Sequence, residues 1–248
     1  MQNYLINLDR SADRLAAFNE RNADVLSVHR FAAVDGRTVA RAELLQTGLF
    51  MPGVTYTDGA VGATLSHLSL WDMAIARNEP LTIIEDDAIF NCNFTAQSQH
   101  LLNSIGDDWH IFLWGYNFDS PLLIRTTPHI SPFCISFSQD ELRKNFEAFC
   151  SADLQPRPFK LVQGSGLVCY SISPAGARLF KRFCTPIRKM QIYFRALNRV
   201  VQNHGLDIMM NAIYVQANCY ACFPPLVVTP NDHAVSLSQR PRTASGQP

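Results

Sequence analysis

Three adjacent carboxylates, Glu85, Asp86 and Asp87, directly follow the apolar run formed by residues 81–84. Like charges at such short range repel one another and raise one another's pKa, so the cluster is unfavourable without a counterion. A divalent cation removes that cost, because Mn²⁺ and Mg²⁺ prefer oxygen ligands and are usually held by one or two carboxylates plus substrate phosphates. The alternative is a solvated acidic loop. The apolar residues on both sides of the triplet favour a metal site.

The elements around the triplet predict an α/β fold. Residues 81–84 read as a buried strand, and ligands bind at the carboxyl ends of the strands in open α/β sheets. Strands and helices alternate along the chain, and turn signals such as Asp35-Gly36 separate them. The pattern predicts strands at 4–8, 28–34, 81–84, 111–114, 167–172 and 219–223. It predicts helices from residue 11 through 18, at 61–77, from Pro174 with Ser173 as its cap, and at 187–203.

Composition and charge narrow the functional classes. Apolar residues make up 47% of the 248 residues, which is enough for a sizeable core. The 21 basic residues equal the 21 acidic ones, so no overall basic field exists to hold a nucleic acid. The first residues lack the plan of a secretion signal, and no apolar run approaches a membrane span. We therefore expect a cytoplasmic protein with at most a peripheral contact at the inner membrane face.

The pattern indicates one domain over residues 1–239 and a disordered tail over 240–248. Residues 116–160 are rich in proline and lack steady periodicity, apart from a helix near 139–150. We interpret this stretch as an irregular excursion that forms a lid or an acceptor wall. Seven cysteines without an export signal favour reduced thiols, and the Cys219–Cys222 pair reads as part of a buried strand.

Several blocks in a fixed order resemble glycosyltransferase family 25, the group of bacterial lipooligosaccharide galactosyltransferases and procollagen galactosyltransferases. The chain departs from the family pattern at Ala63, where cysteine is frequent, and at Gly205-Leu206, where Pro-Val is usual. The second departure leaves the shape of the loop before Asp207 less certain. The matching blocks are residues 4–10 with Asp13-Arg14, 31–36, 62–67 with Trp71, 83–87, 164–177, 204–210 and 224–227.

The resemblance implies a GT-A-like fold, a Rossmann-like mixed sheet flanked by helices, with a nucleotide sugar bound across the strand ends. It implies a mostly inverting transfer of a sugar, galactose from UDP-galactose, to a saccharide or glycolipid acceptor such as the lipooligosaccharide outer core. The cation would bridge the acidic motif and the pyrophosphate and offset charge that grows on the leaving nucleoside diphosphate. The donor-binding residues that we expect are Asn7, Arg14, Asp35, Ser66, His67, Glu85, Asp86, Gly164, Ser165 and Gly166.

Asp87 is the principal metal ligand in this hypothesis, with Glu85 or Asp86 as its partner and His233 as a third ligand from a C-terminal loop. An inverting transfer also needs a general base near the acceptor hydroxyl. Asp207 is the first candidate, because it follows a glycine turn, and Asp119 is the reserve. Asp207 also has a plainer interpretation, because it can simply cap a helix.

Two other classes stay open. A metal-dependent nucleotidyltransferase or phosphohydrolase would also use carboxylates at a strand end. Such enzymes usually need a lysine or arginine near the phosphates or a second carboxylate cluster for another metal, and the sequence has no such cluster. A noncatalytic sugar-binding relative would keep the fold but is expected to have lost the acidic motif, which is present here.

Overall fold

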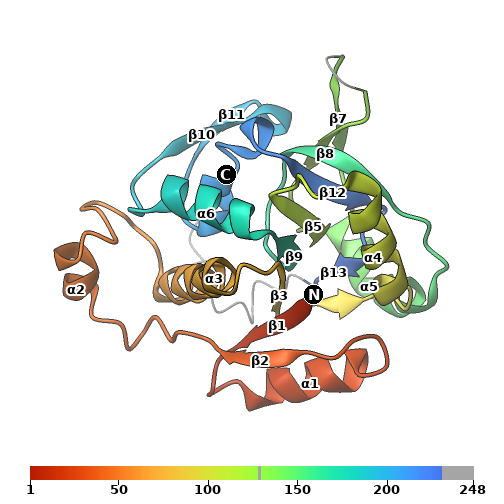
Figure 1. Ribbon diagram of the computed structural model, residues 1–248, viewed down its shortest axis with the longest axis horizontal. Coiled ribbons are helices and arrows are strands. Elements are labelled where there is room, and N and C mark those ends of the chain that lie inside the picture. The colour runs from red at the N-terminus through yellow and green to blue at the C-terminus, as the bar shows by residue number, and fades with distance from the viewer. Residues whose placement is uncertain (128–129, 231–248) are drawn as a thin grey trace.

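A mixed β-sheet of eleven strands runs through the part of the molecule that the computed structural model describes, residues 1–127 and 130–230 (Figure 1). The strand order is β2-β1-β3-β9-β5-β12-β8-β6-β7, and β13 pairs with both β5 and β4. The strands are β1 (Gln2–Asn7), β2 (His29–Ala32), β3 (Leu81–Glu85), β4 (Ile89–Phe90), β5 (Ile111–Gly115), β6 (Leu122–Arg125), β7 (Pro132–Ile135), β8 (Arg157–Gln163), β9 (Cys169–Ile172), β12 (Cys219–Phe223) and β13 (Val227–Val228).

Strand directions bring the candidate residues to one edge of this sheet. β1 pairs in parallel with β2 and β3, and β5 pairs in parallel with β12. β9 lies antiparallel between β3 and β5, so β3 and β5 run in the same direction. The five strands β1, β2, β3, β5 and β12 therefore share one direction. Their carboxyl ends therefore meet at the same edge, and the acidic triplet begins there with Glu85, the last residue of β3.

Helices cover both faces of the sheet. On one face α3 and α6 pack through residues such as Trp71 and Phe180, and on the other α1 and α4 pack through Phe18 and Leu101. Figure 1 shows α3 and α6 together on one side of the central strands and α4 with α5 on the other. The helices are α1 (Ala12–Asn22), α2 (Arg41–Gln46), α3 (Asp58–Arg77), α4 (Phe94–Ile105), α5 (Gln139–Ser151), α6 (Pro174–Cys184) and α7 (Leu206–Met210), with 3-10 turns η1 (Arg195–Leu197) and η2 (Tyr214–Gln216).

This arrangement confirms the predicted α/β class with a central mixed sheet flanked by helices. Local chemistry explains the helix starts. The Ser173 hydroxyl accepts a hydrogen bond from the Gly176 amide at 3.0 Å, and Pro174 takes the first helical position, as the sequence predicts. Thr57 caps α3 in the same way, and Asn78 ends it in the left-handed conformation. None of the helices in the described residues is long and apolar enough to cross a bilayer.

The predicted helix over residues 187–203 is wrong. This segment forms a separate antiparallel ribbon of β10 (Gln191–Phe194) and β11 (Arg199–Gln202), joined by η1 and a turn at Asn198, whose φ is 46°. Residues 191–194 alternate exposed and buried, which is the period of a strand. Ile192 and Phe194 pack against Ile208 of α7. The apolar pattern of this segment fits a helix or a strand, and this tertiary packing favours the strand.

The region 116–160 is also more regular than expected. The helix predicted near 139–150 is present as α5, but the rest of the stretch contributes β6, β7 and the start of β8, which extend the sheet at one end. The segment Cys219–Cys222 lies within β12, and both cysteines are buried free thiols, as the sequence predicts. Residues 231–248, which include the predicted tail, lie outside the described residues.

Candidate functional site

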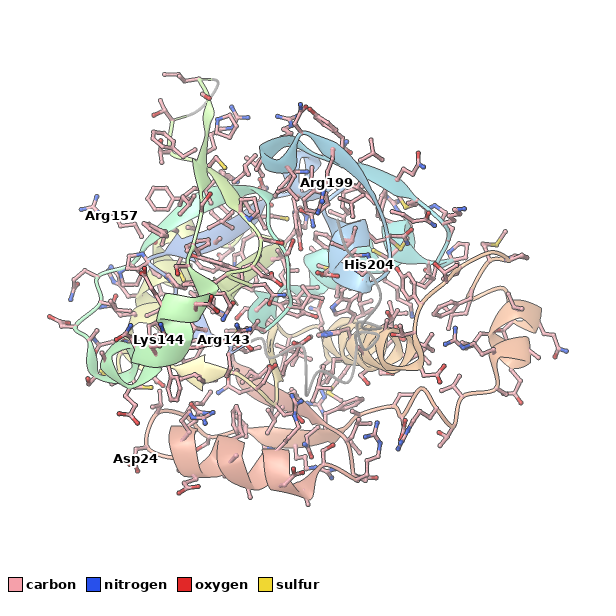
Figure 2. The ribbon with its side chains drawn as sticks, turned by 180° about the vertical axis from the view of Figure 1, so that it is seen from behind. Asp24, Arg143, Lys144, Arg157, Arg199 and His204 are labelled. Atoms are coloured by element: carbon pink, nitrogen blue, oxygen red, sulfur yellow. The ribbon has the colours of Figure 1, made fainter. Side chains whose placement is uncertain are left out.

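A cavity of about 600 Å³ opens at the carboxyl ends of β1, β2 and β3. The loop after β2, the first turns of α3 and the acidic triplet form its walls. Figure 2 shows the molecule from the side opposite to that of Figure 1, with α1 at the bottom of the view. The predicted site residues that line the cavity are Arg14, Asp35, Ser66, His67, Glu85, Asp86 and Asp87.

Asp86 is fully engaged by the protein. Its Oδ2 accepts a hydrogen bond from the Asn7 amide at 2.8 Å, and its Oδ1 is paired with the Arg14 guanidinium. Arg14 also lies near Asp87, at 3.8 Å from Oδ2. Asn7 and Arg14 therefore hold Asp86 in place, and Arg14 also lines the cavity. Neither residue was expected to take this role, since both were predicted to contact the donor.

Asp87 has an oxygen without a hydrogen-bond partner in the part of the chain that the structure describes. Oδ1 of Asp87 is enclosed and accepts no hydrogen bond from these residues, although the side chain as a whole is 36% exposed. The pKa of Asp87 is raised to about 6, mainly by burial and also by the charge of Glu85, while the charge of Arg14 opposes the rise. An enclosed, unpaired carboxylate oxygen beside a second carboxylate is unfavourable until a cation reaches it.

This donor set fits a hard divalent cation that also binds substrate. Among residues 1–127 and 130–230 no group of three or more His, Cys, Asp and Glu side chains could hold a metal ion by itself. Glu85 and Asp87 supply two carboxylates, which is the usual protein contribution to a Mg²⁺ or Mn²⁺ site completed by phosphate oxygens and water. His233, the predicted third ligand, lies outside the described residues.

Asp35 does not face an incoming ligand freely. Its carboxylate accepts from the Arg37 side chain at 2.8 Å and from Arg10 Nε at 2.8 Å. These hydrogen bonds, first from Arg37 and then from Arg10, hold the pKa of Asp35 far below its usual range. Asp35 thus fixes two arginines at the mouth of the cavity, and its contact with the donor stays a prediction.

Sequence reasoning missed these arginines. Arg10, Arg37 and Arg41 all line the cavity, in addition to Arg14. Arg41 is anchored by the Tyr56 carbonyl at 2.9 Å and by Asp58. The available signal was the position of Arg10 and Arg37 just after two predicted parallel strands, where side chains converge. The cavity therefore combines the acidic triplet with four arginines, each of which is paired with a carboxylate of the protein, and this mixed lining suits a diphosphate joined to a cation.

Ser66 and two glycines fasten the loop after β2 to α3. The Ser66 hydroxyl accepts from the Val34 amide at 2.9 Å and donates to the Gly62 carbonyl at 2.8 Å. A Cβ on Gly62 would lie 2.3 Å from the Val34 carbonyl, and one on Gly36 would meet α3 in the same way. Ser66 is therefore buried and satisfied, and it positions the cavity wall.

His67 connects the core to Glu85. Trp71 Nε1 donates to the Tyr170 hydroxyl at 2.9 Å, and that hydroxyl lies 2.9 Å from His67 Nδ1. Burial raises the pKa of Tyr170 well above its ordinary value, so the hydroxyl keeps its proton and donates it to Nδ1. The remaining ring proton is then on Nε2, which lies 3.5 Å from Glu85 Oε1. His67 thus orients Glu85.

Asp207 and the loop 164–166 lie next to this chain of contacts. The Gly166 amide donates to Asp207 Oδ2 at 3.0 Å, and the Gly164 amide donates to Asn211 Oδ1 at 3.0 Å. Burial raises the pKa of Asp207, and the charge of Glu85 contributes to the rise. Gly166 therefore binds the first turn of α7, Gly164 binds Asn211 just after its end, and neither glycine lines the cavity. Ser165 is buried and does not line the cavity either, and its carbonyl accepts from the Asn117 amide at 2.8 Å.

Asp119, the reserve candidate for the base, is exposed in a turn after β5 and does not line the cavity. The structure thus brings together the triplet, Arg14, Asp35, Ser66 and His67. Asp207 does not line the cavity either, although the charge of Glu85 contributes to its raised pKa. The structure separates Asp119 from that group.

Comparison with known proteins agrees with the order of the sequence blocks. A glycosyltransferase 25 family member of Aedes aegypti is 33% identical over 125 residues, which is 45% of this chain and 20% of that protein. Procollagen galactosyltransferase 2 of Homo sapiens is 31% identical over 128 residues, 45% of this chain and 20% of that protein. Inactive glycosyltransferase 25 family member 3 of Mus musculus is 35% identical over 82 residues, 29% of this chain and 14% of that protein.

The chain thus matches a fifth or less of the length of these relatives. The model of glycosyltransferase family 25 (LPS biosynthesis protein) matches residues 1–193, which is well over half of the chain. With this match the resemblance predicted from the sequence is confirmed, and the chain belongs to glycosyltransferase family 25.

Proposed function

We propose that this protein is a metal-dependent glycosyltransferase that moves galactose from UDP-galactose to a saccharide hydroxyl. The observation that carries the proposal is the enclosed Oδ1 of Asp87, which lies beside Glu85, has no hydrogen-bond partner among the described residues, and belongs to a cavity that four arginines also line. The name of the human relative, procollagen galactosyltransferase 2, supports galactose as the sugar. Mn²⁺ is the expected cation, with Mg²⁺ as the alternative.

The residues divide the work of binding the donor. Asp87 and Glu85 hold the cation, which, when bound, neutralises charge on the departing nucleoside diphosphate. Asp86 keeps Arg14 in place, and His67 keeps Glu85 in place. Arg10 and Arg37, held by Asp35, donate charge-assisted hydrogen bonds to phosphate oxygens. Because these donors are already positioned, little reorganisation is needed when the sugar leaves.

Asp207 is proposed as the general base of a direct, inverting displacement. In such a reaction the acceptor hydroxyl gives its proton to the base while its oxygen attacks the anomeric carbon, and the bond to the diphosphate breaks. Burial raises the pKa of Asp207, which makes its carboxylate a stronger base, and the Gly166 amide fixes its orientation. The exposed position of Asp119 favours Asp207 over this reserve candidate.

A GT-A-like arrangement is part of the same proposal. It is supported by the parallel strands β1, β2 and β3, whose carboxyl ends surround the cavity. A crystal structure with UDP would test it, because the arrangement requires the nucleotide to lie across these strand ends. A nucleotide bound elsewhere would contradict both the fold assignment and the metal site.

A nucleotide-sugar screen tests the proposed activity. Purified protein with Mn²⁺ is incubated with UDP-galactose, UDP-glucose, UDP-N-acetylglucosamine and GDP-mannose, with and without a mixture of simple saccharide acceptors. We expect release of UDP from UDP-galactose to rise when acceptor is present, together with a new galactosylated product. Cleavage of nucleoside triphosphates instead would favour a nucleotidyltransferase or phosphohydrolase. Absence of turnover with every donor would favour a noncatalytic relative, a class represented by the inactive mouse protein.

A glycolipid acceptor, such as the saccharide of a lipooligosaccharide outer core, would bring the protein to the inner membrane face. The β10–β11 ribbon supports a peripheral contact there. Tyr193 and Val200 lie opposite each other on its outer surface and are 51% and 57% exposed. Residues 178–199 contain seven Lys or Arg residues and no Asp or Glu. Basic and apolar side chains together favour an anionic lipid surface.

Replacing Tyr193 and Val200 together by serine is therefore expected to weaken binding to phosphatidylglycerol vesicles roughly tenfold, because exposed apolar area that would enter the interface is lost. Co-sedimentation with vesicles of phosphatidylcholine, with and without phosphatidylglycerol, measures the effect. Leu45→Ser is the matched control, since Leu45 is 49% exposed on α2. Equal sedimentation of the double variant and the control variant would rule out this surface.

A further inference from the structure

A second cavity, larger than the candidate donor cavity, contains none of the acidic triplet. It has a volume of about 1320 Å³, compared with about 600 Å³ for the candidate donor cavity, and no residue lines both. It lies between α4 and the strands β6, β8 and β12, which Figure 1 shows on the side of the molecule away from α3. We call it the basic groove. Its lining has no Asp or Glu but four basic residues, His100, Arg125, Arg157 and Lys160.

Strand register places two of these cations side by side. Arg125 of β6 is directly opposite Lys160 of β8, and Lys160 is directly opposite Tyr220 of β12. Residues directly opposite each other point to the same face of a sheet, so the three side chains form a row across three strands. Like charges in directly opposite positions destabilise a sheet, so the row has an electrostatic cost that an anion would remove.

No carboxylate in the described part of the chain neutralises this row of positive charge. Arg125, Arg157 and Lys160 form no ion pair with any of the described residues. Lys160 Nζ donates to Asn218 Oδ1 at 2.9 Å and lies 4.1 Å from the centre of the Tyr220 ring. The amide of Asn218 donates in turn to Asp108 at 2.8 Å, so this acid reaches Lys160 only through a neutral side chain. The groove therefore keeps its positive charge.

The rest of the lining indicates the class of ligand. Gln97, Ser104, Thr126 and Gln155 add uncharged hydrogen-bonding groups around the cations. The volume exceeds the usual range of small-molecule pockets, roughly 300–1,000 Å³, and suits several linked sugar rings. Arginine matches the oxygens of a phosphate with paired donors. We propose that the basic groove binds a saccharide that carries a phosphate group.

This site is separate from the donor cavity and does not depend on the proposed function. If that function is correct, the groove holds a charged part of a long acceptor while its terminal hydroxyl is near the donor. The two ideas fail independently, because binding at the groove requires neither UDP nor a metal ion.

Calorimetric titration of the full chain with a matched pair of ligands tests the proposal. The probes are mannopentaose with a terminal phosphate, mannopentaose without phosphate, and inorganic phosphate. We expect the phosphorylated pentasaccharide to bind at least about tenfold more tightly than either of the others, and its affinity to fall as salt is added. Equal affinity for phosphorylated and plain mannopentaose would overturn the anionic class. Equal affinity for inorganic phosphate would overturn the saccharide class.

Single substitutions locate the binding. Arg125→Ser and Lys160→Ser are each expected to reduce the affinity for the phosphorylated pentasaccharide about tenfold. Lys144→Ser is the control, because Lys144 is an exposed cation on α5 that does not line the groove; Figure 2 labels it together with Arg157. Asp87→Asn should bind the pentasaccharide like the parent. Unchanged affinity in both groove variants, or an equal loss in Lys144→Ser, would overturn the proposal while leaving the assignment of the donor cavity untouched.

Discussion

Asp87→Asn is expected to abolish Mn²⁺-dependent UDP binding and to lower turnover by at least about a hundredfold, since even groups that only support a metal ligand cost 10- to 100-fold when removed. The substitution keeps the shape of the side chain. It also removes a charge that the enclosure of the site and Glu85 disfavour, as the raised pKa of Asp87 indicates. The folded state should therefore be as stable as the parent or more stable in the absence of metal.

Calorimetric UDP titration with and without Mn²⁺, together with a thermal melt, measures both effects. Asp24→Asn is the matched control, because Asp24 is an exposed carboxylate that does not line the cavity and that Figure 2 places beyond the end of α1. The control should bind UDP like the parent. If Asp87→Asn does the same, the metal assignment is wrong.

Asp207→Asn is expected to reduce kcat by about 10²- to 10⁴-fold, the usual contribution of a general base, while UDP binding in the presence of Mn²⁺ is retained. The amide oxygen of asparagine can still accept the Gly166 N–H hydrogen bond, so the local structure should persist. Steady-state kinetics with a saccharide acceptor, UDP titration and a thermal melt are measured on the same preparation.

The plainer interpretation of Asp207 is structural, because it lies in the first turn of α7 and binds the loop before β9. In that case the asparagine variant would keep its activity, or it would lose activity and UDP binding together with its thermal stability. Asp119→Asn provides the comparison, since it removes the reserve candidate. A large loss of kcat in Asp119→Asn with normal activity in Asp207→Asn would exchange the roles of the two residues.

The parts of the fold that the sequence predicts well are those with strong local signals. The apolar run before Glu85 marks β3, and the spacing of Leu65, Leu68 and Trp71 marks α3. The sequence predicts a helix over 187–203, because the apolar residues there fit the period of a helix as well as that of a strand. Packing against Ile208, which is distant in sequence from β10, favours the strand. Likewise β6 and β7 are stabilised by pairing with each other and with β8, which no local pattern encodes.

The sequence predicts which types of residue form the candidate site, but it does not predict which residues contact one another there. The sequence indicates acidic residues at a strand end, but their partners come from other segments. Asp86 is held by Asn7 and Arg14, and Asp35 is held by Arg10 and Arg37. Whether a charged side chain faces a ligand or a neighbour depends on these long-range pairings, so the roles of Arg14 and Asp35 could not be settled before the fold was known.

Thermal unfolding with UDP, in the presence of Mn²⁺ and in the presence of a chelator, tests the central claim most directly. Saturating UDP at about 100 times its Kd should add roughly 2.7 kcal/mol of stability, which corresponds to a rise in Tm of roughly 5–10 °C for a chain of this size. The account predicts this rise with Mn²⁺ and a negligible one with the chelator. An equal rise in both conditions, or no rise with Mn²⁺, would contradict the assignment of Glu85 and Asp87 as the groups that bind a diphosphate through a cation.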